Sequence, residues 1–147
     1  MIRKLTDNQI EKIERIEIIK QKHKIDLLCI VNREFAILIE DKTNTKNHSN
    51  QLENYLTKIS KDFSREKIFP IYFKTGDQSN FATIHKAGYK LFLRPDLIEV
   101  LDFGKNQGVT NSIYLDFYDY LTRIENSFQS FKNLSVDEWH WDSWKGF

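Results

Sequence analysis

Cysteine is almost absent from this chain, and long apolar runs are missing. A single cysteine, Cys29, stands among 147 residues, which excludes an internal disulfide and any zinc site built on several cysteines. It lies in an apolar stretch, where a reduced thiol packs like a small hydrophobic side chain, so we expect no catalytic thiol. No run approaches the roughly 18 to 20 apolar residues that cross a bilayer, and the N-terminal residues lack a signal-peptide stretch. We therefore expect a cytoplasmic protein with no membrane partner.

The composition is sufficient for one folded domain. Hydrophobic residues make up 40% of the chain and aromatic residues 14%, enough for a real core at this length. The formal net charge is only +1, but residues 1–75 carry 15 basic and 11 acidic side chains, whereas residues 76–147 carry 7 and 10. A polyanion would therefore dock on the first half. An ordinary solvated surface explains so small an imbalance equally well.

The hydrophobic pattern predicts a mixed α/β domain. A helix is expected to begin at residues 6–8, with Ile10, Ile13 and Ile16 on its apolar face. Strands are predicted over residues 17–21, 25–31, 35–39, 67–74 and 89–93. Further helices are predicted over residues 52–63, from Pro95 or Asp96 to Leu101, and over 112–131, with a loop at 103–108. We expect one domain over 1–147, with a core of about 6–93 and a C-terminal helical extension of about 94–147. Pro70 favours an edge position or a bulge for its strand.

Two of these strands should form a hairpin whose turn is centred on Arg33. Residues equidistant from the turn then pair, which places Asp26 opposite Glu40. The two carboxylates become cross-strand neighbours, with Cβ atoms roughly 4.5 to 5.5 Å apart. Alternation along the strand puts Lys42 on the face of Glu40 and turns Asp41 to the other face.

Two carboxylates this close repel each other unless a cation offsets their charge. Mg²⁺ is suited to the position, because it needs only one or two protein carboxylates and completes its shell with water and phosphate oxygens. Lys42 beside it could hold or help to deprotonate an attacking water and stabilise charge on a phosphate. The pattern therefore indicates phosphodiester hydrolysis.

The same residues carry a resemblance to a known family. Ile25-Asp26, then Glu40-Asp41-Lys42, then Gln51 to Tyr55 resemble the PD-(D/E)XK nuclease superfamily, in particular its branch with a downstream QxxxY motif. The resemblance spans residues 17–73, and Ile25 stands where the family name has proline. It implies a restriction-endonuclease-like αβββαβ core, with a mixed sheet flanked by helices, followed here by C-terminal helices.

The resemblance implies a metal site. Asp26 and Glu40 would ligate Mg²⁺ or Mn²⁺, and the backbone carbonyl of Asp41 would complete the set. A further acidic ligand from the first helix or strand is common in the family, and Glu14 and Glu17 are both candidates.

The resemblance also implies catalytic roles and a substrate. Lys42 would be the catalytic lysine, and Gln51 and Tyr55, one helical turn apart, would position it or contact the nucleic-acid backbone. The expected partner is nucleic acid, DNA rather than RNA. Such nucleases serve in DNA repair or phage defence. A basic run before Asp26, residues 20–24, is usually a solvated hairpin end but here could meet phosphates.

Two alternatives stay open. A single D…E-x-K pattern is weak, so a catalytically silent module that keeps the nuclease fold for nucleic-acid binding or protein assembly is the rival function. Trp139, Trp141 and Trp144 lie close to the end of the chain and either complete the core or form a surface for a protein partner or a homodimer, exposed by truncation. We favour the second account of these tryptophans, because the chain ends within the aromatic cluster.

Overall fold

The computed structural model describes residues 1–21, 24–43 and 50–147. The chain divides into two compact units, Met1–Phe92 and Leu93–Phe147, which are considered in turn. No helix in these described ranges is both long enough and apolar enough to cross a membrane.

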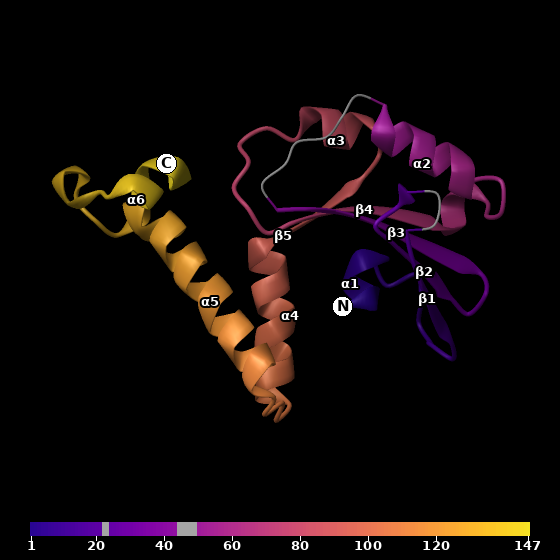
Figure 1. Ribbon diagram of the computed structural model, residues 1–147, viewed down its shortest axis with the longest axis horizontal. Helices are drawn as coiled ribbons and strands as arrows, with labels where there is room; N and C mark the ends of the chain where they lie inside the picture. Colours follow the sequence, from indigo (N-terminus) through magenta and orange to yellow (C-terminus); the bar gives the residue numbers. More distant parts are fainter. Residues whose placement is uncertain (22–23, 44–49) are drawn as a thin grey trace. The chain divides into compact units, whose positions relative to one another are not determined.

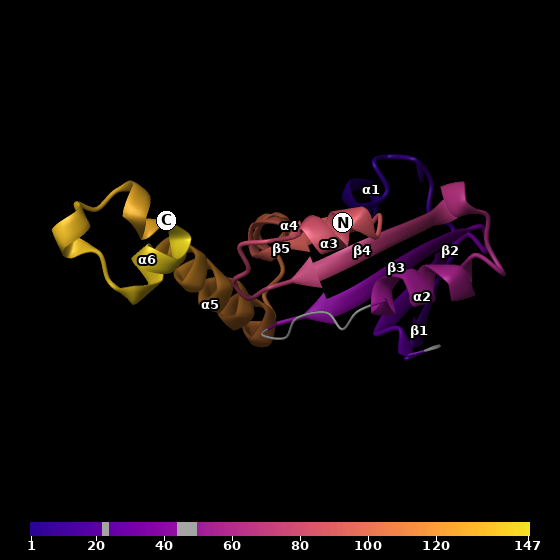
Figure 2. The same cartoon turned by 90° about the horizontal axis from the view of Figure 1, so that it is seen from above.

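A five-stranded mixed sheet is the frame of the first unit, as the sequence predicted (Figure 1). Its strands lie in chain order, and β1, β2 and β3 are antiparallel, whereas β3 and β4 are parallel. Figure 2 shows β3 and β4 side by side and running the same way. The strands are β1 (Ile16–Lys20), β2 (Leu27–Val31), β3 (Phe35–Lys42), β4 (Ile68–Lys74) and β5 (Lys90–Leu93).

The β2–β3 hairpin has the predicted register. Val31 pairs with Phe35 and Leu27 with Ile39, so the pairing is symmetric about Arg33. Asn32 and Arg33 both have positive φ, 54° and 57°, and the N–H of Glu34 donates to the carbonyl of Val31 at 3.0 Å, which closes the turn. The turn thus determines which residues of β2 and β3 meet.

Helices cover both faces of this sheet (Figure 1). On one face, α2 (Gln51–Ile59) and α3 (Ala82–Lys86) contribute Leu52, Tyr55, Ile59 and Ile84 to the core. On the other lies α1 (Ile2–Leu5). The apolar face of α2 follows from the helical spacing of its buried residues.

The first predicted helix is wrong. The chain forms only the short α1 and then leaves helical geometry, because Asp7 and Asn8 adopt positive φ of 49° and 62°. Asp and Asn tolerate this conformation better than most residues. Ile16 begins β1 instead of ending a helix, and its branched side chain suits a strand.

Two further expectations were also wrong. Pro70 lies in β4, which is an inner strand of the sheet, and pairs with Leu38 of β3. The predicted loop at 103–108 is mostly helix, because α4 (Arg94–Asn106) continues to Asn106. Gly104 lies within α4, and the hydroxyl of Tyr114 occupies the space that a Cβ atom at this position would need.

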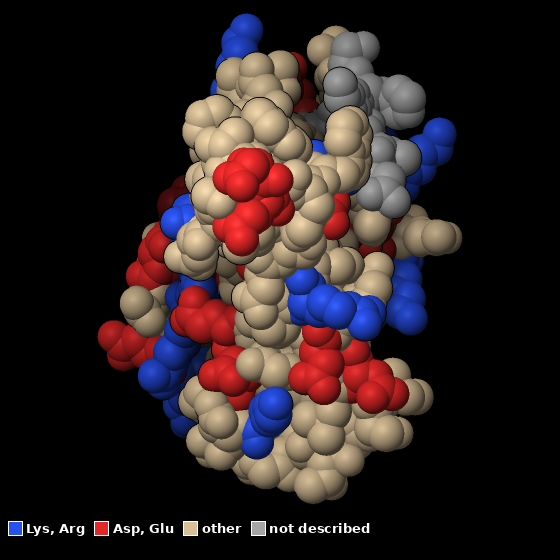
Figure 3. All heavy atoms as spheres, turned by 90° about the vertical axis from the view of Figure 1, so that its left-hand side faces the viewer, with Lys and Arg blue, Asp and Glu red and all other residues tan. Residues whose placement is uncertain are grey.

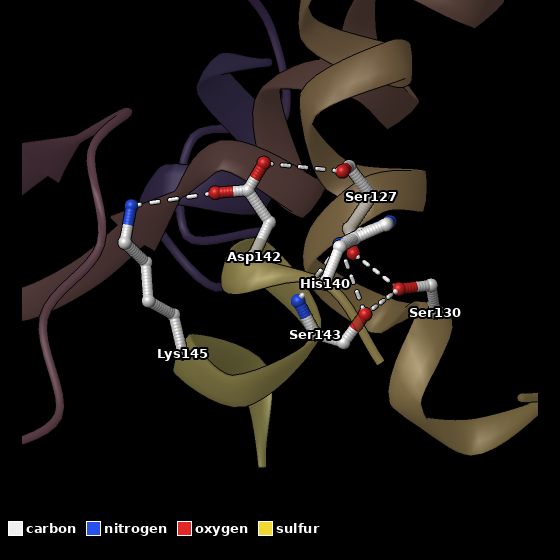
Figure 4. A network of polar contacts seen from close by, with 6 residues as sticks. All are labelled: Ser127, Ser130, His140, Asp142, Ser143 and Lys145. Atoms are coloured by element: carbon white, nitrogen blue, oxygen red, sulfur yellow. Dashed lines mark hydrogen bonds and ion pairs between the residues drawn. The ribbon is translucent and has the colours of Figure 1, made fainter. Parts of the chain in front are cut away.

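The second unit is helical. After α4 come α5 (Ser112–Gln129) and α6 (Trp141–Gly146), with 3-10 turns at Ser130–Lys132 and Val136–Glu138. Arg94 is buried and forms an ion pair of 2.8 Å with Glu125 of α5. A polar network joins α6 to α5 and to the turn after it (Figure 4): the Ser127 hydroxyl donates to Asp142 Oδ2 at 3.2 Å, and the Ser143 hydroxyl meets that of Ser130 at 2.6 Å.

The C-terminal tryptophans differ in exposure. Trp139 packs edge-on against Trp144, with ring centroids 4.8 Å apart, and also against Phe147. Trp141 and Trp144, however, are 74% and 53% exposed. The cluster closes part of this unit and leaves large apolar rings at its surface, so the predicted partner interface stays a prediction.

Candidate active site

The candidate site lies on the α2 face of the sheet, where β3 and β4 end. Glu40 is level with Tyr72 of β4, and Lys42 with Lys74. Because side chains alternate along a strand, Glu40 and Lys42 share one face. Lys42 Nζ lies 2.6 Å from Glu40 Oε1, which agrees with the predicted placement.

Glu40 is the centre of a hydrogen-bond network. Its side chain is only 1% exposed, and Oε1 accepts a hydrogen bond from Gln51 Nε2 at 2.9 Å. The same Nε2 donates to the hydroxyl of Tyr55 at 2.6 Å. Residues four apart on a helix lie on one face, so α2 brings both side chains to the end of β3.

Asp26 lies just outside the hairpin ladder. We expected a strand from residue 25, but β2 begins at Leu27, and its pairing with β3 ends at Leu27 and Ile39. One more step of the register brings Asp26 level with Glu40. Its Oδ2 accepts the backbone N–H of Asp41 at 2.9 Å, while the residue itself is exposed to solvent. This hydrogen bond holds Asp26 at the end of β3, although Asp26 is not itself part of a strand.

The pKa values in the site reflect burial and close charges. Burial raises the pKa of Glu40, and the negative charge of Asp26 raises it further, against the opposing effect of Lys42. Burial lowers the pKa of Lys42, but the hydrogen bond and charge of Glu40, together with Asp26, outweigh burial, so its pKa is raised. Burial also raises the pKa of Asp41, with Asp26 adding to the effect. The site concentrates negative charge and holds Lys42 as an ammonium.

Two buried oxygens of the site accept no hydrogen bond from the described residues. Glu40 Oε2 is buried and accepts no hydrogen bond among the atoms described, and the same is true of Gln51 Oε1. A buried carboxylate oxygen left unpaired costs free energy, so it usually has a ligand or a water. A divalent cation at Oε2, shared with Asp26, would satisfy it and offset the repulsion between the carboxylates. The residues present therefore fit Mg²⁺ or Mn²⁺, although no group of three or more His, Cys, Asp or Glu side chains gathers within the described part of the chain.

The other acidic candidates lie far from this point. Glu17 is level with Ile30 of β2, four residues beyond Asp26 and so roughly 13 Å along the strand. Glu14 precedes β1, and its N–H donates to the side chain of Asn32 in the turn at the opposite end of the hairpin. Neither is brought to Asp26 and Glu40.

The basic features around the site are dispersed. Lys20 and Lys24 of the predicted basic run are exposed, and residues 22 and 23 lie outside the described ranges. Figure 3 shows the side of the molecule that lies on the left in Figure 1, and acidic and basic side chains of the described residues are intermingled there.

Two residues of β4 belong to the site and escaped the sequence interpretation. Tyr72 is fully buried, and its hydroxyl donates to Gln78 Oε1 at 3.3 Å. Lys74 is 3% exposed, and its Nζ donates to the backbone carbonyl of Thr43 at 2.9 Å. A signal was present, because β4 is an apolar strand that ends in a charge, as β3 does. Only the parallel pairing of the two strands shows that their ends meet.

Comparison with known proteins identifies a family. A family model described as the PD-(D/E)XK nuclease superfamily matches residues 2–138. No curated protein and no solved structure matches the chain.

Proposed function

The chain belongs to the PD-(D/E)XK nuclease superfamily, and we propose that it hydrolyses DNA phosphodiester bonds with Mg²⁺ or Mn²⁺ as its metal. The observation that carries this proposal is the buried, unpaired Oε2 of Glu40 beside Asp26, with Lys42 Nζ 2.6 Å from the other oxygen. Asp26 and Glu40 would hold the metal, together with the backbone carbonyl of Asp41. Bound there, the cation would supply Lewis-acid activation of the phosphate and of a water.

In this mechanism a water molecule loses a proton to bulk water as its oxygen forms a bond to phosphorus, the bond from phosphorus to the leaving sugar oxygen breaks, and that oxygen takes up a proton from bulk water. Lys42 is an ammonium in the free protein, so its direct role would be to orient the water and to stabilise negative charge on the pentavalent phosphorus. Gln51 binds Glu40 and Tyr55 at once, which positions the carboxylate before substrate arrives.

The test is cleavage by the purified chain with Mg²⁺ or Mn²⁺ on linear, circular and single-stranded DNA. Glu40→Gln and Asp26→Asn should each abolish cleavage and weaken Mn²⁺ binding measured by calorimetry. Glu34→Gln is the matched control, because Glu34 is an exposed carboxylate at the opposite end of the same hairpin, paired with Lys67. Its cleavage should equal that of the wild type. Absence of cleavage on all three substrates with both metals would contradict the proposal.

A catalytically silent module is the second candidate function. It is favoured by the site having only two carboxylates close together, with no third acidic or histidine ligand gathered beside them in the ranges that the structure covers. Under this alternative the chain binds DNA without metal and without turnover. Loss of Mn²⁺ binding in Glu40→Gln would count against it.

A further inference from the structure

Lys74 is an unusual residue for its place in the fold. It ends an otherwise largely apolar strand and is 3% exposed. Burying an ammonium costs free energy unless hydrogen bonds and charges compensate, and an apolar side chain of similar size is often no less stable at such a position. A lysine here therefore suggests a role beyond packing.

The neighbours of Lys74 define that role. Its Nζ donates to the carbonyl of Thr43 at 2.9 Å, and the residue is level with Lys42 on the neighbouring parallel strand. Burial lowers the pKa of Lys74, the charge of Asp77 raises it, and the charge of Lys42 lowers it. The two lysines are thus close enough to interact, and Lys74 is hydrogen-bonded to Thr43, the residue that follows Lys42.

The geometry points to Lys74 as a positioning residue, which fastens the Lys42–Thr43 end of β3 to β4 and so holds the Lys42 ammonium at Glu40. The contact acts where β3 ends, so nothing in the strand ladder beyond Lys42 would replace it. Lys42 reaches Glu40 Oε1 at 2.6 Å from a backbone that this hydrogen bond restrains. A displacement of about 1 Å at such a group can cost on the order of 100-fold in rate.

The kinetic part of the test rests on the proposed nuclease function, whereas the exchange part does not. Lys74→Met removes the donor and keeps the length, and Lys74→Arg keeps a donor. Lys67→Met is the matched control, because Lys67 lies next to the other end of β4, has a side chain that is 39% exposed and pairs with Glu34. Three quantities are measured on the full chain: the unfolding midpoint, kcat and KM on DNA, and metal-free hydrogen exchange of the peptide containing Lys42 and Thr43.

We expect Lys74→Met to keep or raise the unfolding midpoint, to exchange faster at Lys42 and Thr43, and to lose about 10- to 100-fold in kcat with KM nearly unchanged. Lys74→Arg should recover most of kcat, and Lys67→Met should match the wild type. Unchanged exchange and kcat in Lys74→Met would overturn the inference, as would a loss of stability that tracks the loss of kcat. If the wild type cleaves no DNA, faster exchange still supports the positioning contact while the nuclease proposal fails. Should Lys74→Met not fold, Lys74→Leu, which also lacks a donor, undergoes the same measurements with the same outcomes.

Discussion

Lys42 and Glu40 form an ion pair of 2.6 Å whose side chains are 14% and 1% exposed. Lys67 and Glu34 form another of the same length, with side chains 39% and 49% exposed. Two lysine–glutamate pairs of equal length thus differ mainly in burial. Comparing the two pairs therefore separates the contribution of burial to the free energy of unfolding from that of the contact itself.

Removing the lysine of each pair should give very different results. Lys42→Met leaves a buried carboxylate without its cation and should lower the free energy of unfolding by about 3 kcal/mol. Lys67→Met should change it by less than about 1 kcal/mol, because exposed pairs contribute little. Chemical denaturation measures both, and equal losses would show that burial of the Lys42–Glu40 pair has no energetic consequence. In cleavage assays Lys42→Met should also lose about 100- to 1000-fold in kcat.

The hydroxyl of Tyr55 should matter more for turnover than for stability. Tyr55→Phe removes the acceptor of the 2.6 Å hydrogen bond from Gln51 and should cost about 1 kcal/mol in unfolding free energy. Because Gln51 then positions Glu40 less firmly, we expect kcat to fall about 10-fold. Tyr118→Phe, which loses a hydrogen bond to Asp102 in the second unit, is the control and should leave cleavage unchanged. Equal rates for both variants would refute the positioning role of Tyr55.

The hairpin turn can be improved without touching the site. Arg33 has φ of 57°, and a residue with Cβ is strained there, so Arg33→Gly should raise the free energy of unfolding by about 1 kcal/mol. Asn32→Ala should lower it, because the Asn32 side chain accepts the N–H groups of Glu14 and Arg15. Thermal unfolding of the two variants checks the opposite signs.

The buried pair of the second unit should behave as a coupled unit. Arg94→Met or Glu125→Leu alone breaks an ion pair whose side chains are only 6% and 16% exposed and should cost about 3 to 5 kcal/mol of unfolding free energy. The double variant should recover most of this loss, because no unpaired charge remains. A double-mutant cycle from denaturation curves gives the coupling, and simple additivity of the single losses would disprove it.

The sequence alone determined the local geometry of the site. The register about Arg33 follows from the hairpin turn, and the shared face of Glu40 and Lys42 follows from strand alternation. The i, i+4 spacing of Gln51 and Tyr55 follows from the helix. These relations depend on neighbours in the chain, so the residue pattern is sufficient to predict them. The family and the mixed sheet were predicted from the resemblance that these residues carry, and the C-terminal helices from their hydrophobic pattern.

Only the tertiary structure decided the rest. The parallel pairing of β3 with β4 brings Lys74 and Tyr72 to the site, and it joins segments more than thirty residues apart that no local pattern relates. The tertiary structure also decided the positions of Glu14 and Glu17, which lie beside other parts of the hairpin and away from Glu40. It decided as well that α1 ends at Leu5, before Asp7 and Asn8 adopt positive φ. Long-range packing selects among conformations that local preferences leave nearly equal in free energy, and those choices determine which charges meet at Glu40.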